Sequence, residues 1–375
     1  MTDVLGRRVL VIGDGASVFV RDFICQYHGR GVRIDLISFS CCEEVPGVES
    51  QFNCRFSAGG LGKLLFLRDL YSALRRTDGV YDSVVLHFVY PFMAFFLPFL
   101  RGKSRRLISV VWGSDFYRSS FVKRVAQAMI FWASTRIVFT NPETLKDFSR
   151  GVLRPKSRLC VARFGLPVLD QIERYQENDA DRSALCGFFG LPAERKIVLV
   201  GYNSSPAQRH VDIVRELRRL DSSIRNRMHL VFHLGRGGDQ LKSTLRDLLA
   251  ECEIAEYTIL SEFYGFSDIA RLRCVTDILI NVQVSDQFSG SMQETLYAGG
   301  VVVAGDWLPY QELLSFGRQI CLVHSLGELP AMVEQIVVSK ASSHTSPGLK
   351  DYIAGVSSWS ATMHHWDDAL FGGAD

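Results

Sequence analysis

The chain alternates short apolar runs with segments whose apolar residues recur at helical spacing. Near-continuous apolar runs separated by helices are typical of parallel sheets that are covered on both faces. The sequence therefore predicts an α/β protein with doubly wound parallel sheets. The predicted strands are 8–12, 32–38, 83–88, 107–111, 136–140 and 158–162 in the first half, and 196–200, 229–234, 257–260, 277–284, 301–304 and 320–323 in the second.

A polar segment, 169–194, divides the chain into two parts of similar size. We predict an N-terminal Rossmann-like domain over 1–168, a linker over 169–194, a second Rossmann-like domain over 195–345 and a C-terminal helix within 346–375 that packs back on the body. A length of 375 residues fits two domains. Two doubly wound domains that face each other leave a cleft at the carboxyl ends of their strands, where ligands bind.

Composition excludes several classes of protein. The chain is 47% hydrophobic with a formal net charge of +2, which argues against a dedicated nucleic-acid binder. Its nine cysteines are odd in number and scattered, without a C-x-x-C pair, which disfavours a disulfide framework and a zinc site. The N-terminus lacks the features of a signal peptide, and no apolar run reaches ~18 residues. We therefore expect a cytoplasmic protein without a bound metal.

The most informative segment joins the strand 277–284 to a helix that starts at residue 289 or 290 and ends at the glycine pair 299–300. Free amide groups and the positive dipole end at a helix start suit phosphate oxygens. Asp286 and Glu294 flank the seven residues at this turn. A carboxylate placed within such a helix can accept hydrogen bonds from sugar hydroxyls. The segment therefore predicts a binding site for a nucleotide-sugar.

These residues resemble the GT-B glycosyltransferases, specifically the retaining nucleotide-sugar transferases of glycosyltransferase family 4. That family carries an E-x7-E signature, a small-residue helix and a second strand. Here Asp286-x7-Glu294 is followed by 297–300 and 301–304, and the glycine loop within 229–238 is similar to an upstream element. The resemblance covers roughly 196–338 well and the N-terminal half loosely.

The resemblance implies a GT-B fold, with two facing Rossmann-like domains and a cleft between them. It implies transfer of a sugar from a nucleotide-sugar donor to a hydroxyl of a glycan or lipid-linked acceptor, with retention, in bacterial-type cell-surface polysaccharide assembly. The nucleotide-sugar would be a co-substrate, and no further cofactor or metal is expected.

The resemblance also implies roles for four residues of the signature. Glu294 would bind the ribose, Asp286 would contact the donor sugar, and Gly290 and Ser291 would offer backbone amides to the diphosphate. The ordinary alternatives are an exposed helix glutamate for Glu294 and a turn-capping aspartate for Asp286. Because both carboxylates are expected to line a cleft, we expect alanine substitutions to lower transfer and to leave folding intact.

The loop after strand 196–200 departs from the family pattern. The family places an arginine there to neutralise the leaving diphosphate, and this chain has Tyr202. Within the loop we predict donor contacts from Asn203 and from Arg209, the nearest cation, with Arg236 in the next loop as a second candidate. A guanidinium can bind phosphate in bidentate fashion.

The first half contributes four further candidates. Gly13 and Gly15 follow the strand 8–12 and would lie near the donor diphosphate, although a tight turn explains them equally. His87 ends one strand and Asp115 follows another, so either could act on the acceptor hydroxyl or orient the sugar. For His87 the alternative is a buried core histidine.

The aromatic segment 86–100 is followed at once by Arg101, Lys103, Arg105 and Arg106, and later by Arg118, Lys123 and Arg124. An apolar surface with a cationic rim could contact an anionic membrane from the cytoplasmic side. The alternative is a buried helix with a solvated basic loop.

Three rival functions stay open. A GT-B sugar-nucleotide epimerase would need the same donor and no acceptor. A dinucleotide-dependent oxidoreductase is suggested by Gly13-x-Gly15, although the third glycine is missing. A non-catalytic GT-B scaffold is suggested by Tyr202 at the arginine position.

Overall fold

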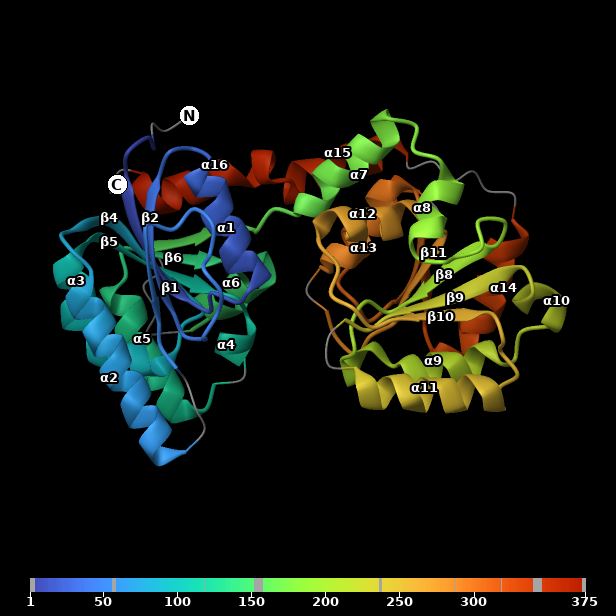
Figure 1. The fold of residues 1–375 in the computed structure, drawn as a ribbon, viewed down its shortest axis with the longest axis horizontal. Coiled ribbons are helices and arrows are strands. Elements are labelled where there is room, and N and C mark those ends of the chain that lie inside the picture. The colour runs from blue at the N-terminus through green and yellow to red at the C-terminus, as the bar shows by residue number, and fades with distance from the viewer. Residues whose placement is uncertain are drawn as a thin grey trace. The chain divides into compact units, whose positions relative to one another are not determined.

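The structure is a computed structural model, and it describes residues 4–55, 59–117, 119–151, 158–235, 238–286, 288–317, 319–339 and 346–372. It divides into two compact units. Unit 1 comprises Met1–Gly165 together with Trp359–Asp375, and unit 2 comprises Leu166–Ser358. Each unit is a parallel sheet with helices on both faces (Figure 1).

The sheet of unit 1 has the strand order β3-β2-β1-β4-β5-β6-β7, and every pair in it is parallel. The order reverses between β1 and β4, which is the point where ligands bind in doubly wound sheets. The strands are β1 (Arg8–Gly13), β2 (Arg33–Ser38), β3 (Ser50–Asn53), β4 (Tyr81–His87), β5 (Ser104–Val111), β6 (Arg136–Phe139) and β7 (Leu159–Val161).

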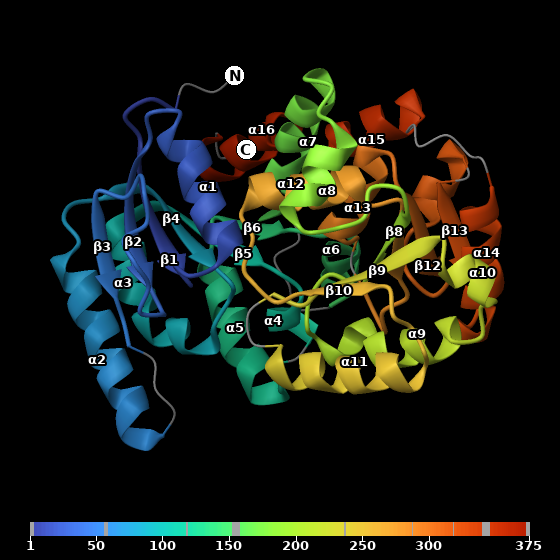
Figure 2. The ribbon, with the colours of Figure 1, turned by 45° about the vertical axis from the view of Figure 1, so that its right-hand side comes forward.

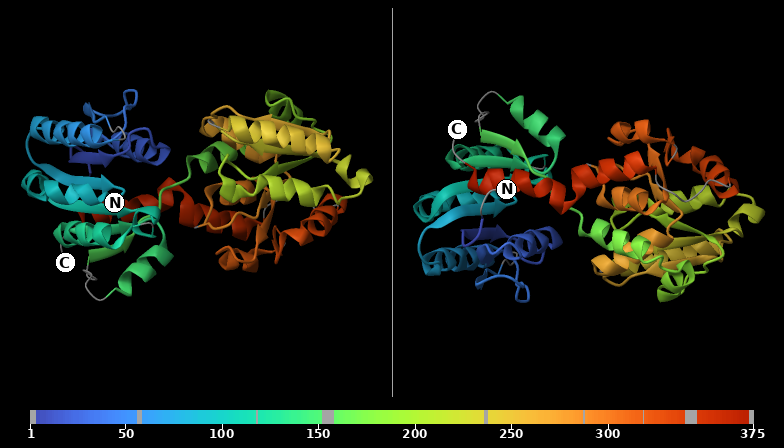
Figure 3. Two further views of the ribbon diagram at one scale, coloured as in Figure 1. Left: turned by 90° about the horizontal axis from the view of Figure 1, so that it is seen from below. Right: turned by 90° about the horizontal axis from the view of Figure 1, so that it is seen from above.

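Side chains alternate across this sheet, so Leu10 and Ile12 join one core while Val9 and Val11 join the other. On the first face lie α2 (Gly60–Arg76), η1 (Pro91–Phe96), α3 (Leu97–Lys103), α5 (Phe121–Ala133) and α6 (Pro142–Ser149). On the second face lie α1 (Val18–His28) and α16 (Trp359–Phe371), and α16, red in Figure 3, packs on β4, β5 and β7. The short helix α4 (Ser114–Tyr117) follows β5.

Unit 2 repeats this plan with the order β10-β9-β8-β11-β12-β13, again with parallel pairs. The order reverses between β8 and β11, which places the switch point at their carboxyl ends. The strands are β8 (Lys196–Val200), β9 (Met228–His233), β10 (Tyr257–Leu260), β11 (Ile278–Asn281), β12 (Val301–Gly305) and β13 (Ile320–Val323).

Two helical layers cover the sheet of unit 2. One contains α7 (Pro167–Glu177), α8 (Arg182–Phe188), α12 (Phe266–Val275), α13 (Gly290–Ala298) and α15 (Pro347–Ser357). The other contains α9 (His210–Leu217), α10 (Ser222–Arg225), α11 (Asp239–Glu251) and α14 (Leu329–Val338). Short 3-10 turns occur at η3 (Pro206–Gln208), η4 (Gln311–Phe316) and η5 (Leu326–Glu328).

The domain boundaries differ from the sequence prediction in two places. The predicted linker 169–194 forms most of α7 and all of α8, and its buried residues Leu169, Ile172 and Leu185 belong to the core of unit 2. The predicted single helix in 346–375 is two helices, α15 in unit 2 and α16 in unit 1. Polar composition hid the apolar stripe of α7, because a helix needs only one buried face to belong to a core.

The aromatic segment 86–100 is largely interior. It forms the end of β4, then η1 and part of α3, and Met93, Phe96 and Leu100 are buried in the core of unit 1. Phe95 is 80% exposed and Pro98 is also exposed, while the other residues of the segment are buried or half-buried, so the segment does not form the continuous apolar surface expected there. Among the described residues, no helix is both long and apolar enough to cross a bilayer.

Candidate active site

Strained backbone gathers at the carboxyl ends of the strands next to both switch points. Phe88 follows β4 with φ 69°, Arg209 ends the loop after β8 with φ 60°, and Phe288 follows β11 with φ 87°. Non-glycine residues with positive φ cost of order 1–3 kcal/mol each and cluster at functional sites. These loops are therefore candidate functional sites of the two units.

In unit 2, the turn before α13 is held by Asp286. Its carboxylate accepts a hydrogen bond from the Ser289 amide at 3.1 Å and another from the Tyr310 hydroxyl. Asn281 Nδ2 in turn donates to that hydroxyl at 2.8 Å. Burial, and then the charge of Asp286, raise the pKa of Tyr310 well above its usual value, so the phenol stays protonated and donates. The turn-capping role is thus part of what Asp286 does.

Helix α13 begins at Gly290, as the sequence predicts, and ends where Gly299 adopts φ 105°. The Ser289 hydroxyl caps it by accepting from the Met292 amide at 3.4 Å. Among the described residues, the amides of Gly290 and Ser291 have no acceptor. A helix start of this kind suits the oxygens of a phosphate.

Glu294 lies in a buried ion pair. Arg273 Nε donates to Glu294 Oε2 at 3.0 Å, and Arg273 Nη2 donates to Ser291 Oγ at 2.7 Å. The Arg273 side chain is 2% exposed and that of Glu294 is 9% exposed. Glu294 is therefore not an exposed helix glutamate. Because an unpaired buried charge is costly, we expect its removal to destabilise the fold, in contrast to the expectation from the sequence.

Arg273 contacts two residues of this candidate site and was not predicted from the sequence. It lies on α12 near Leu272 and Val275, which are fully buried, so a cation stands on an apolar helix face. A charged residue in that position signals a buried partner, although nothing in the sequence names the partner. Its Nη1 has no hydrogen-bond partner among the described residues. Burial, and then the charge of Arg273, lower the pKa of His233 at the end of β9 to about 4.

The loop after β8 contributes two predicted donor residues. Asn203 Oδ1 accepts from the Ser205 amide at 2.9 Å and so shapes the loop. Arg209 pairs with Asp212 of its own helix at 3.6 Å and is one-third exposed. Arg236, the second candidate cation, lies outside the described residues.

Tyr202, which stands where the family has an arginine, is part of a hydrogen-bond network. Its hydroxyl accepts from Gln283 Nε2 at 3.0 Å, and Gln208 Nε2 donates to Gln283 Oε1 at 2.9 Å. Trp307 Nε1 donates to the Gln283 carbonyl at 2.8 Å. The network ties the loops after β8, β11 and β12 together at the carboxyl edge of the sheet.

In unit 1, both glycines of the first loop are required by close packing. A Cβ on Gly13 would lie 2.9 Å from the Cβ of His87. A Cβ on Gly15 would lie 2.8 Å from both Ser38 Oγ and Cys42 Sγ, and the Gly15 amide donates to Ser38 Oγ at 3.0 Å. This packing accounts for the glycines without a ligand and leaves a ligand role a prediction.

His87 is enclosed by aromatic rings. It is 1% exposed, its ring centroid lies 4.8 Å from that of Phe23 and 5.8 Å from that of Phe164, and both ring nitrogens lack a partner among the described residues. Burial lowers the pKa of His87 to about 3, so the ring is neutral. The geometry favours a packing role over a general base for an acceptor.

Asp115 joins two loops of unit 1. Its carboxylate accepts from the amides of Val89 at 2.9 Å, Trp112 at 3.0 Å and Gly113 at 2.9 Å, and it is 5% exposed. Burial raises the pKa of Asp115, while the amide hydrogen bonds act in the opposite direction. A carboxylate engaged by three amides is primarily an anchor for the loops after β4 and β5.

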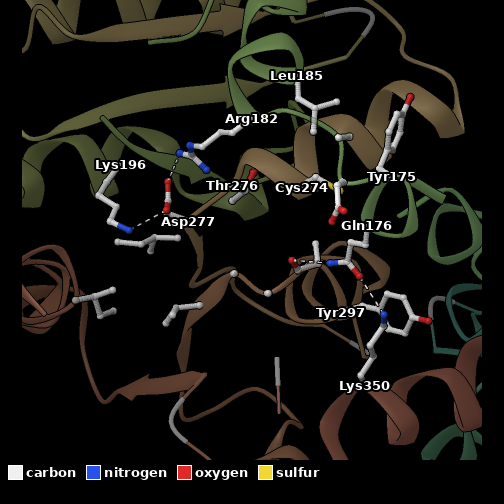
Figure 4. A pocket seen from close by; sticks show the side chains of 18 of the residues that line it. Tyr175, Gln176, Arg182, Leu185, Lys196, Cys274, Thr276, Asp277, Tyr297 and Lys350 are labelled. Atoms are coloured by element: carbon white, nitrogen blue, oxygen red, sulfur yellow. Dashed lines mark hydrogen bonds and ion pairs between the residues drawn. The ribbon is translucent and has the colours of Figure 1, made fainter. Parts of the chain in front are cut away.

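A cavity of about 650 Å³ lies at the other edge of the unit 2 sheet, at the amino ends of β8, β11 and β12 (Figure 4). The cations on its wall are paired, because Arg182 and Lys196 both contact Asp277, at 2.7 and 3.0 Å, and Lys350 contacts Glu173 at 3.1 Å. Ligands of doubly wound sheets bind at the carboxyl edge. The cavity is therefore not the candidate site.

Among the described residues, no group of His, Cys, Asp and Glu side chains is arranged to hold a metal ion.

Comparison with known proteins rests on structure alone, because no family model and no curated protein matches the sequence. Sucrose-phosphate synthase from Thermosynechococcus elongatus is 13% identical with a TM-score of 0.73, and the match covers 97% of this chain and 99% of that one. A UDP-forming trehalose-phosphate synthase from Burkholderia xenovorans is 11% identical with a TM-score of 0.74, over 99% and 100% of the two chains. The chain has the GT-B fold.

A third similar structure is that of Anabaena HepE in complex with UDP and glucose, at 13% identity and a TM-score of 0.68 over 96% of this chain and 98% of that one. At such low identity the likeness shows the fold and no more.

Proposed function

We propose that this GT-B chain is a glycosyltransferase that moves a sugar from a nucleotide-sugar to a hydroxyl of a glycan or lipid-linked acceptor, with retention, in cell-surface polysaccharide assembly. The observation that carries the proposal is the turn before α13. It combines the unpaired amides of Gly290 and Ser291 with the carboxylates of Asp286 and Glu294. The neighbour HepE, which was solved with UDP and glucose, supports this choice of donor class.

In this proposal the diphosphate binds at the start of α13, where the amides and the helix dipole favour negative charge. Glu294 Oε2 is held by Arg273, and Glu294 Oε1 lies 3.7 Å from the position of a Cβ on Gly290. The second oxygen therefore lies beside the helix start, where it can accept from a ribose hydroxyl. Asp286, fixed by Tyr310, contacts the donor sugar.

Transfer with retention needs stabilisation of the leaving diphosphate more than a protein nucleophile. Arg209 is the described cation that we assign to this task, since its guanidinium is partly exposed at the carboxyl edge of β8. Its present partner, Asp212, is itself half exposed, so the pair is weak and can be exchanged for a phosphate. No resident cofactor or metal is part of the proposal.

We assign acceptor contacts to unit 1, with the acceptor met at the inner face of the cell membrane. His87 and Asp115 are proposed to shape the acceptor edge through packing and loop anchoring, because both are buried and their surroundings favour those roles. Gly13 and Gly15 keep the first loop close to the sheet.

A non-catalytic GT-B scaffold is the second candidate, and a specific observation favours it. Asp286 and Glu294 are both engaged in internal bonds, and Tyr202 stands in place of the family arginine. A scaffold would show no turnover of any donor. An epimerase would convert the donor without an acceptor.

The test begins with thermal unfolding of the purified protein in the presence of UDP, GDP, dTDP, CDP, CMP or NAD. A ligand at about 100 times its Kd that binds only the folded state stabilises it by ~2.7 kcal/mol. We expect one nucleoside diphosphate to raise the melting temperature. A response to NAD alone would instead support the oxidoreductase.

The matched variants are Asp286→Asn and, as a control, Asp247→Asn on the exposed surface of α11. Asp286→Asn should lower acceptor-dependent transfer by at least ~100-fold, the scale of a lost active-site contact, while the control stays at the wild-type rate. Equal activity of the two variants would exclude Asp286 from the site.

A further inference from the structure

Helix α5 exposes large apolar side chains along one face. Phe121 is 82% exposed and Val122 is 77% exposed, and the exposed residues at the following turns are Val125, Met129 and Trp132. Residues three and four apart share a helix face, so these side chains form a stripe. The opposite face is buried, with Ile130 and Phe131 in the core and Gln127 Nε2 donating to the Val89 carbonyl at 2.8 Å.

The exposed apolar side chains extend across the same helical layer of unit 1. η1 packs on α5 and presents Phe95, which is 80% exposed. On the other side of η1, α2 contacts it through the rings of Phe66 and Phe92 at 5.3 Å. The first turns of α2 expose Leu61, Leu64 and Leu65. In Figure 2, α2 and α5 stand on either side of α3.

We call this surface the α2–α5 face and define it by its exposed apolar residues Leu61, Leu64, Leu65, Phe95, Phe121, Val122, Val125, Met129 and Trp132. Five of these nine side chains stand along α5 alone. Monomeric soluble proteins rarely expose large apolar patches unless the patch binds something.

The charges on this face are almost all positive. Lys63, Lys123 and Arg124 are exposed and have no carboxylate partner among the described residues. The segment 91–134 holds a single carboxylate, Asp115, which is buried in its amide cluster. Apolar side chains with exposed cations among them match the surface of an anionic bilayer, where lipid headgroups supply the negative charge.

We propose that the α2–α5 face is the membrane-docking surface of this protein and that its partner is an anionic lipid bilayer. A second copy of the chain fits the face less well, because a symmetric contact would bring Lys123 and Arg124 toward the same cations of the partner without carboxylates to meet them. The proposal rests on the proposed lipid-linked setting for its biological meaning, but docking itself requires neither donor nor transfer.

The face also differs from the one that the sequence suggested. In the aromatic run 86–100, Phe95 and Pro98 are exposed, while α5 supplies five of the nine side chains that define the face. Docking through α5 would bring unit 1, to which we assign the acceptor contacts, against the leaflet that holds a lipid-linked acceptor.

The experiment is co-sedimentation of the full chain with vesicles of phosphatidylcholine alone or of phosphatidylcholine mixed with phosphatidylglycerol, at low and high salt. We expect binding to the mixed vesicles that weakens with salt, since exposed cations are screened. Phe121→Ser with Val125→Ser should lower the partition coefficient by at least about tenfold, because each large apolar side chain contributes substantially to burial in the interface. Lys123→Glu with Arg124→Glu should lower the partition coefficient for the mixed vesicles only, by roughly fivefold for each cation removed.

The control is Val80→Ser with Val338→Ser. Val80 is 53% exposed and Val338 is 51% exposed, and both lie outside the α2–α5 face. Their variant should bind vesicles like the wild type. Absence of binding to mixed vesicles, or equal loss in the control, would overturn the proposal. So would a concentration-dependent dimer in light scattering that Phe121→Ser abolishes, because the occupant would then be a second copy.

The nucleotide response in thermal unfolding separates this inference from the proposed function. A Phe121→Ser, Val125→Ser protein that keeps the response but loses vesicle binding shows a docking defect with an intact donor site. Vesicle binding without any nucleotide response would leave docking standing and contradict the transferase.

Discussion

The buried pair of Arg273 and Glu294 permits a prediction that separates structure from catalysis. The perturbation is Glu294→Ala, which removes the carboxylate that accepts from Arg273 Nε at 3.0 Å. Because the Arg273 side chain is only 2% exposed, water cannot replace that carboxylate without a local rearrangement. Breaking one partner of such a pair costs about 3–5 kcal/mol.

The cost translates into a melting shift. In a domain of 150–250 residues, each kcal/mol of lost stability lowers the melting temperature by about 2–4 °C. Glu294→Ala should therefore lower the melting temperature of unit 2 by roughly 6–20 °C. The double variant Arg273→Met, Glu294→Met removes both charges and fills similar volume, and replacing a buried pair in this way is often neutral. We expect it to recover most of the lost stability.

The assay is hydrogen exchange of peptides from α12 and α13 together with thermal unfolding, because a two-domain protein need not unfold in a single transition. Exchange in both helices should rise in Glu294→Ala and fall back in the double variant. If the double variant is stable yet does not respond to any nucleotide, Glu294 or Arg273 serves the donor site as well as the fold.

A Glu294→Ala protein that melts within about one degree of the wild type would contradict the cost assigned to the buried pair, since the loss of one partner of such a pair is expected to be larger. Asp247→Asn, on the exposed surface, is again the control and should not change exchange in either helix.

Three further predictions follow from the geometry. Tyr310→Phe removes the hydroxyl that donates to Asp286, so transfer should fall by about tenfold, with only ~1–3 kcal/mol of lost stability, as measured by kinetics and urea unfolding. His87 has a folded pKa of about 3, below its unfolded value of ~6.5, so the stability that it contributes is present above pH 6.5 and is lost as pH falls toward 3. In His87→Phe, the difference between the unfolding free energies at pH 7 and pH 5 should therefore shrink by ~2 kcal/mol. An unchanged difference would contradict the burial of a neutral ring. Gly13→Ala should destabilise the protein by ~1–3 kcal/mol because its methyl would lie 2.9 Å from the His87 Cβ, whereas Gly60→Ala, with open space around it, should not; equal melting temperatures would count against the close approach.

Much of the fold could be predicted from the sequence, because buried parallel strands are written as continuous apolar runs. The exception among the strands is β3 (Ser50–Asn53), whose residues are half-buried or exposed and which pairs only with β2 at the edge of the sheet. An edge strand needs no apolar run, so no apolar pattern in the sequence predicted β3. The polar segment 169–194 was misread for a related reason, since composition averages over the buried face of α7.

The site divides in the same way. The helix that starts at Gly290 and ends at Gly299 was predicted because caps and glycines are local signals. Tyr310 and Arg273 stand 24 and 21 positions from the carboxylates they contact, and no spacing rule joins residues that far apart.

Local sequence is enough to predict the alternation of strands and helices, the turn before α13 and its carboxylates. Packing within each unit is what pairs and buries Glu294, keeps His87 neutral among aromatic rings, and leaves an exposed apolar face on α5 and not on 86–100. The physical reason is that a side chain's charge state and exposure depend on what packs against it. That neighbour is set by the fold of the whole unit and is absent from any local stretch of sequence.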